Sequence, residues 1–267
     1  MRRLQLLEIE DQPWCPRAVR DGGTDWLRFM ADVTKAFNAI APKIRGAMDA
    51  TGTSAVVDLC SGGGGPWATL EPELAQTGPL RVTLTDLYPN VEALAHVREE
   101  THGRASFLET SVDATDVPIE LDGVRTMFNC FHHFEPAMAR AILGDAVRKR
   151  RAIAVFEGVD RRWLPIVGMP LQGAMVLALT PFVRPLKWSR LFFTYVVPAI
   201  PALVMFDGTV SMLRIYLPDE LRELVRSVPD SETFDWDIGT TRVPMRRGSK
   251  LKAPLGITHI VGVPRGS

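Results

Sequence analysis

The 267-residue chain has 31 basic and 31 acidic residues, and 46% of it is hydrophobic. Zero net charge gives no global field to attract nucleic acid or an acidic partner, and the hydrophobic content is too high for a disordered chain. The three cysteines are widely spaced and odd in number, which argues against a disulfide framework and matches no zinc site. The N-terminus has no apolar run long enough for a signal peptide, so we expect a cytoplasmic protein.

The first predicted element is a helical cap. Between Leu27 and Ile44, apolar residues recur at helical spacing, with Thr24 as a candidate N-cap. Pro42 should break or kink this helix, because a helix interior does not accept proline readily. We therefore predict that residues 1–52 form an N-terminal loop and a helical cap.

The central and C-terminal regions predict an α/β fold. Alternation of strands with helices indicates a doubly wound, parallel sheet in residues 53–160. In residues 217–267 a last helix precedes two strands that a loop joins directly, and such a link implies antiparallel pairing. We expect a mostly parallel, seven-stranded sheet with a terminal antiparallel pair. The predicted strands lie near 54–59, 80–85, 105–109, 124–129, 152–157, 233–241 and 257–263.

Residues 161–216 form an insertion that this core does not require. Residues 163–182 and 191–206 are uncharged but contain several prolines, whereas a membrane span needs about 20 uninterrupted apolar residues. We predict a helical lid over the carboxyl edge of the sheet, which ends in a turn at 207–209 and accepts a small apolar or amphipathic substrate. Peripheral membrane contact is the alternative, because four residues of types common at membrane interfaces interrupt the apolar blocks: Arg184, Lys187, Trp188 and Arg190.

The most informative motif follows the first strand of the core. Asp58 ends the strand, a glycine-rich turn follows, and Pro66 opens a helix. Glycine permits a positive φ angle and lets a ligand approach the main chain closely. In open α/β sheets this crevice at the carboxyl end of the strands binds nucleotide-like ligands.

Two ligands fit such a turn. A dinucleotide pattern can be placed on Gly63-x-Gly65-x-x-Ala68 with Asp86 as the ribose contact, but a pyrophosphate would sit badly beside Asp58. With a cationic ligand, Asp58 either helps to hold an ammonium group or orders the turn. The pattern Asp58-x-Cys60-x-Gly62-x-Gly64 resembles the first motif of class I S-adenosylmethionine-dependent methyltransferases, with Cys60 where many members have glycine. The resemblance is closest to small-molecule enzymes of the ubiquinone/menaquinone-biosynthesis type.

The resemblance implies S-adenosylmethionine as the cofactor. Asp86 would accept the ribose hydroxyls, unless it is a helix N-cap, and Asp113 with Ala114 would read the adenine amino group, unless Asp113 only forms a turn. Asn129 would face the methionine, and it lacks the Pro-Pro-aromatic continuation of nucleic-acid adenine methyltransferases. The implied cofactor residues are Asp58, Cys60, Gly62, Gly64, Asp86, Leu87, Asp113, Ala114 and Asn129.

Two histidines follow the strand that, by the resemblance, would face the transferable methyl. His133, ahead of His132, is a candidate general base, although both could instead hold the loop. Arg214 and Tyr216 are candidates to orient a substrate or to pin the lid. We predict methyl transfer from S-adenosylmethionine to a small, largely apolar acceptor at oxygen or carbon. The alternatives are an NAD(P)-dependent oxidoreductase and a protein of this fold that binds the cofactor without methylating.

Overall fold

The computed structural model describes residues 3–158, 161, 166–244 and 252–266. It divides into two compact units, of which one contains Met1–Thr34 with Asp160–Ile215 and the other Lys35–Val159 with Tyr216–Ser267. We refer to them as the helical unit and the sheet unit. The basic loop residues at 246, 247 and 250 lie outside the described residues.

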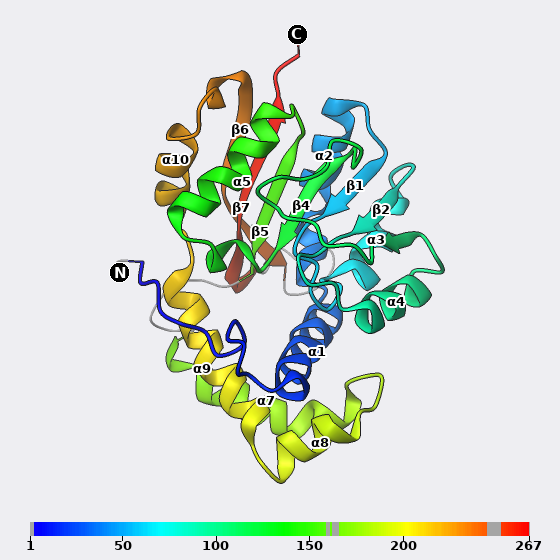
Figure 1. The fold of residues 1–267 in the computed structure, drawn as a ribbon, viewed down its shortest axis with the longest axis vertical. Helices are drawn as coiled ribbons and strands as arrows, with labels where there is room; N and C mark the ends of the chain where they lie inside the picture. The colour runs from blue at the N-terminus through cyan, green and yellow to red at the C-terminus, as the bar shows by residue number, and fades with distance from the viewer. Residues whose placement is uncertain (1–2, 159–160, 162–165, 245–251, 267) are drawn as a thin grey trace. The chain divides into compact units, whose positions relative to one another are not determined.

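The sheet unit contains a seven-stranded sheet in the order β3-β2-β1-β4-β5-β7-β6 (Figure 1). β1 pairs in parallel with β2 and β4, whereas β7 lies antiparallel between β5 and β6. The predicted sheet with its terminal antiparallel pair is confirmed. The strands are β1 Ala55–Asp58, β2 Arg81–Leu84, β3 Ala105–Phe107, β4 Val124–Phe128, β5 Ile153–Glu157, β6 Phe234–Pro244 and β7 Lys252–Pro264.

Helices cover both faces of this sheet. On one face α5 and α10 pack against the alternate apolar residues of β1, β4, β5 and β7, for example Val57 and Val155. On the other face α2 contacts α3 and strands β4, β5 and β7. The two faces follow from the period-2 alternation of side chains along each strand. The helices are α2 Ala41–Thr51, α3 Trp67–Ala75, α4 Val91–Glu100, α5 Pro136–Arg148 and α10 Pro218–Arg226, with the 3₁₀ turns η1 Ala36–Ile40, η2 Phe131–His133 and η4 Ser231–Thr233.

The predicted start and break of the N-terminal helix are wrong. α1 runs over Arg17–Thr34, so Thr24 lies inside it and its hydroxyl donates to the Arg20 carbonyl at 3.1 Å. Pro42 does not interrupt a helix but lies in the first turn of α2. Proline is tolerated there because the amide of that position has no intrahelical acceptor.

The helical unit surrounds a core of its own. Its helices α7 Met169–Leu179, α8 Trp188–Tyr195 and α9 Ala199–Arg214, with η3 Thr180–Phe182, pack with α1 around a cluster that includes Trp26, Val176, Ile200 and Leu203. Among the described helices no single one is long and apolar enough to cross a membrane, although α8 and α9 together, bent by 77°, meet the criteria of length and composition.

The turn predicted at 207–209 is also wrong, because α9 continues through it to Arg214. A Cβ on Gly208 would lie 2.5 Å from the Met169 side chain, so the glycine permits α7 and α9 to pack closely within a continuous helix. Asp207 has a structural role within α9. Its carboxylate accepts hydrogen bonds from the amides of Ile9 and Glu10 at 2.8 and 2.9 Å. It thereby anchors the N-terminal segment to α9.

Candidate functional site

The glycine-rich turn has the backbone that its sequence predicts. β1 ends at Asp58, and α3 begins at Trp67, directly after Pro66. Between them the φ angles of Cys60, Gly62 and Gly64 are 56°, 51° and 98°. Cys60 is thus a non-glycine residue in a conformation that glycine favours.

Two glycines of this turn serve different purposes. A Cβ on Gly64 would lie 2.2 Å from a methyl group of Val97, so this glycine is required for α4 to pack against the turn. A Cβ on Gly62 would meet no protein atom within 4 Å. The main chain at Gly62 therefore borders open space, as a turn that receives a ligand must.

Asp58 lies beneath the turn and is 1% exposed. Its carboxylate accepts the hydroxyls of Thr126 and Ser61, each at 2.7 Å, and Ser61 in turn accepts the amide of Thr85 at 3.2 Å. Burial raises the pKa of Asp58 to about 7, although these two hydroxyls act to lower it. Of the two roles considered for Asp58, this geometry supports the one in which it orders the turn.

Asp86 joins the end of β2 to the glycine turn. Its Oδ2 accepts the amide of Gly62 and its Oδ1 the amide of Tyr88, both at 2.8 Å. The N-cap of α4 is Asn90, so the alternative in which Asp86 caps that helix is wrong. Leu87, which follows it, is 42% exposed. The structure thus brings Asp86 and Gly62 together at the carboxyl edge of the sheet.

The loop after β3 lies against the same edge. The Val112 amide donates to the Asp86 carbonyl at 2.9 Å. Asp113 is exposed and accepts both the amide and the hydroxyl of Thr115, at 2.8 and 2.7 Å, whereas Ala114 is buried. Asp113 therefore forms a turn and also lies in a loop that is bonded to the Asp86 segment.

Asn129 directly follows β4 at the carboxyl edge of the sheet. Its φ angle is 49°, and its Oδ1 accepts the amide of Gly158, after β5, at 2.7 Å. Next to it, a hydrogen bond with Cys60 and burial together raise the pKa of the Cys130 thiol well above its usual range. The two thiols thus meet where β1 and β4 end.

His132 is held by Glu157, an acidic residue that the sequence analysis does not single out. Its Nδ1 lies 2.8 Å from Oε2 of Glu157, and its amide donates to Oε1 at 3.1 Å. Both residues are buried, and the His133 ring lies 4.4 Å from that of His132. Glu157 ends the apolar strand β5 as Asp58 ends β1, and that pattern could have identified it.

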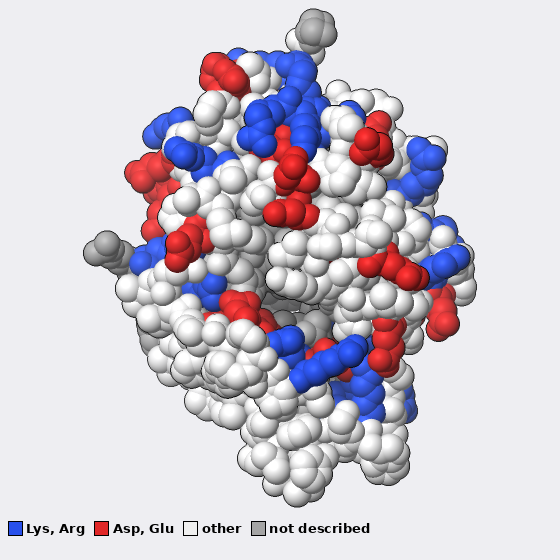
Figure 2. All heavy atoms as spheres, in the orientation of Figure 1, with Lys and Arg blue, Asp and Glu red and all other residues white. Residues whose placement is uncertain are grey.

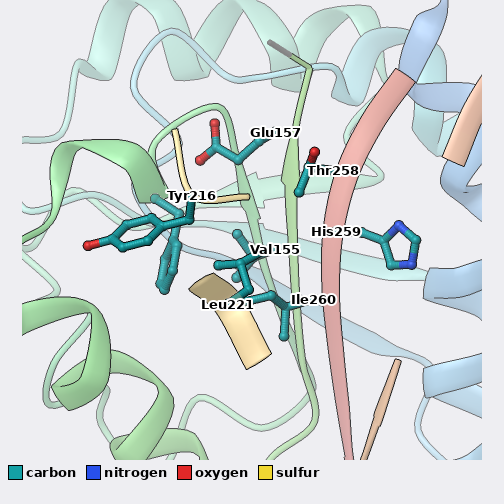
Figure 3. Close-up of a pocket in the computed structure, with 8 residues that line it drawn as sticks. Val155, Glu157, Tyr216, Leu221, Thr258, His259 and Ile260 are labelled. Carbon is teal, nitrogen blue, oxygen red and sulfur yellow. The ribbon is translucent and has the colours of Figure 1, made fainter. Parts of the chain in front are cut away.

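The substrate candidates Arg214 and Tyr216 fall in different units. Within the helical unit Arg214 is 4% exposed and pairs with Glu8 and Asp11 at 3.3 and 3.1 Å, which favours the pinning role. In the sheet unit the Tyr216 hydroxyl donates to the Phe134 carbonyl at 2.8 Å. Tyr216 borders a cavity of about 10 Å³, room for roughly one water molecule. Figure 3 shows Glu157 on the Tyr216 side of β7 and His259 on the other.

Two solved structures with a similar arrangement carry O-methyltransferase names. The chain is 15% identical, with a TM-score of 0.52, to an O-methyltransferase of neocarzinostatin biosynthesis solved with S-adenosylmethionine and 2-hydroxy-5-methyl naphthoic acid; the match covers 93% of this chain and 58% of that one. The chain has the fold of a class I methyltransferase. A second match, at 14% identity and a TM-score of 0.51, is a protein of Nostoc punctiforme proposed to be an O-methyltransferase, with 94% and 61% covered.

The likeness is one of fold rather than of sequence. No protein-family model and no curated protein matches the sequence. The chain also spans only about three fifths of the length of the two structural neighbours. Many folds of this kind host unrelated activities, so function must be argued from the residues at the carboxyl edge of the sheet.

Proposed function

We propose that this protein transfers a methyl group from S-adenosylmethionine to a small, largely apolar acceptor, at oxygen or carbon. The observation that carries the proposal is the turn at Gly62, whose main chain borders open space and is bonded to the carboxylate of Asp86. Its support from outside the chain is the neocarzinostatin-pathway enzyme of the same fold, solved with this cofactor and a naphthoic acid. The finer resemblance to ubiquinone/menaquinone enzymes stays a prediction.

Different residues at the carboxyl edge of the sheet would bind different parts of the cofactor. Asp86 would accept the ribose hydroxyls, since a carboxylate oxygen can accept more than one hydrogen bond. Leu87 would contact the adenine and, with Asp113 and Ala114, form its pocket, while Asn129 would lie near the methionine. Asp58, Cys60, Gly62 and Gly64 would shape the turn against which the cofactor rests. When bound, S-adenosylmethionine supplies an electrophilic methyl group on a positively charged sulfur.

His132, rather than His133, which the sequence favours, is our candidate for the general base. The Glu157 carboxylate at Nδ1 fixes the ring's orientation and stabilises the cation formed when Nε2 takes a proton from the acceptor. The second bond, from the His132 amide to Glu157, holds the loop as well as the ring. Glu157 is therefore a positioning residue, and proton removal is needed because an oxygen or carbon nucleophile must lose its proton.

Binding calorimetry tests the cofactor assignment. Asp86→Ala should weaken S-adenosylmethionine by about 1.5–3 kcal/mol, the range for hydrogen bonds to a charged group. Asp116→Ala is the matched control, because the Asp116 side chain is 83% exposed and pairs with Lys149 instead. Thermal shifts should appear with S-adenosylmethionine and S-adenosylhomocysteine but not with NAD. Equal affinity of the wild type and folded Asp86→Ala, or stabilisation by NAD alone, would refute the assignment.

A further inference from the structure

Helix α8 of the helical unit presents its apolar face to solvent. Trp188, Phe192, Tyr195 and Val196 recur at helical spacing and are 81%, 46%, 48% and 68% exposed. The opposite face carries Arg190 and Thr194, which are 2% and 0% exposed. A surface helix of a globular protein normally has the reverse arrangement, with apolar residues inside and polar residues outside.

Polar contacts within the unit hold α8 in this orientation. Arg190 donates to the carboxylate of Asp25, on α1, and to the carbonyls of Val183 and Pro185. Lys187 pairs with the same carboxylate at 3.3 Å. Turning the aromatic residues inward would break these bonds and leave Asp25 buried without its cations, which is costly. The exposed aromatic face is therefore a stable feature of the helical unit.

The apolar surface extends beyond α8. Leu177, Phe182 and Leu186 are 43%, 63% and 48% exposed, and the Tyr195 hydroxyl donates to the Leu177 carbonyl at 2.6 Å. Figure 2 shows that the surface over α7, α8 and α9 is mostly uncharged. We define the aromatic patch as the seven residues Leu177, Phe182, Leu186, Trp188, Phe192, Tyr195 and Val196. A contiguous exposed surface of this kind marks an interaction site rather than scattered apolar residues.

The charge around the patch indicates what covers it. From residue 163 to residue 206 the only charged side chains are Arg184, Lys187 and Arg190, and none is acidic. Because Arg190 and Lys187 pair with Asp25, the charge that this segment offers at the surface is that of Arg184. Arg184 is exposed between Phe182 and Leu186. Tryptophan and tyrosine favour the boundary between lipid headgroups and acyl chains, and cations beside them attract anionic lipids. A bilayer can bind the aromatic side chains and the cationic side chain of this surface at the same time.

We propose that the aromatic patch docks the protein on an anionic phospholipid bilayer. Trp188 and Phe192 enter the boundary between headgroups and acyl chains, while Arg184 meets the lipid phosphates. The helices lie on the membrane and need not cross it. The aromatic patch consists of residues of the helical unit and the proposed cofactor residues belong to the sheet unit, so the proposal does not depend on methyl transfer.

Vesicle sedimentation of the full chain tests this proposal. Wild-type protein should bind vesicles that contain phosphatidylserine more tightly than vesicles of phosphatidylcholine alone. The variant Trp188→Ser with Phe192→Ser should lose at least about tenfold in partitioning, because two apolar side chains no longer leave water. Arg184→Gln should lose about fivefold, on anionic vesicles only. The control Ile119→Ser with Met138→Ser removes two exposed apolar residues of the sheet unit, which are 52% and 49% exposed, and should bind as wild type.

Two results would overturn the proposal. One is equal binding by the patch variant and the control variant, with both shown to be folded by circular dichroism. The other is sedimentation velocity showing that the wild type is a dimer which the patch variant dissociates, with no vesicle binding by either. That outcome would assign the patch to a second copy of the chain.

Discussion

Replacing Asp58 by asparagine should remove a pH dependence from the stability of the sheet unit. Burial raises the pKa of Asp58 to about 7 in the folded protein, whereas an unfolded chain has an Asp pKa of about 3.9. The folded carboxyl therefore holds its proton more tightly than the unfolded one. Its contribution to stability is fully present below about pH 4 and is lost as the pH rises through about 7.

The size of this effect follows from the difference in pKa. About three units at 1.36 kcal/mol each correspond to roughly 4 kcal/mol between about pH 4 and pH 8. Asparagine has the same shape and can still bond the hydroxyls of Ser61 and Thr126, but it does not ionise. Relative to wild type, Asp58→Asn should therefore gain up to about 4 kcal/mol of stability as the pH rises over this range.

Urea unfolding followed by circular dichroism measures the difference at each pH. Ser61→Ala provides a companion variant of opposite sign, because the Ser61 hydroxyl lowers the pKa of Asp58. Its loss should raise the pKa of Asp58 further, so that the fall in stability continues to higher pH and becomes larger. A difference between Asp58→Asn and wild type that stays constant from about pH 4 to pH 8 would mean that Asp58 is ionised in the folded protein, and our reasoning about its burial would be refuted.

Three further predictions concern the carboxyl edge of the sheet. His132→Gln should lower kcat by at least about 10²-fold at nearly unchanged cofactor affinity, whereas His133→Gln should change kcat by no more than about threefold. Glu157→Gln should also shift the pH–rate profile. Equal effects of the two histidine changes on kcat would contradict the assignment of His132 as the base. Gly62→Val should abolish cofactor binding, because a β-branched residue resists a positive φ and fills the open space. Gly64→Ala should instead lower the free energy of unfolding by about 1–3 kcal/mol, and adding Val97→Ala should restore part of that loss. A loss of cofactor binding by Gly64→Ala without a loss of stability would contradict the packing role of Gly64.

The sequence by itself predicted the architecture of the sheet unit. Strand runs of four or five residues that end in Asp58, Leu84 or Phe128 are local patterns, and their alternation with helices determines parallel pairing. The direct link between the last two strands likewise leaves only antiparallel pairing. The glycine turn was predicted because positive φ angles are a property of single residues and their neighbours.

Contacts between distant segments were decided by the tertiary structure alone. Glu157 and His132 are 25 residues apart, and their pairing depends on β4 and β5 lying side by side. Asp207 and Gly208 read locally as a turn, yet packing against Met169 and the N-terminal segment keeps them helical. Helix α8 is the clearest case of a distant contact that decides the structure. Its apolar residues suggest a buried face, but the bond between Arg190 and Asp25 holds the helix with that face toward solvent. Local patterns predict which elements form, whereas the partners of a buried charge, distant in sequence, determine which way an element faces.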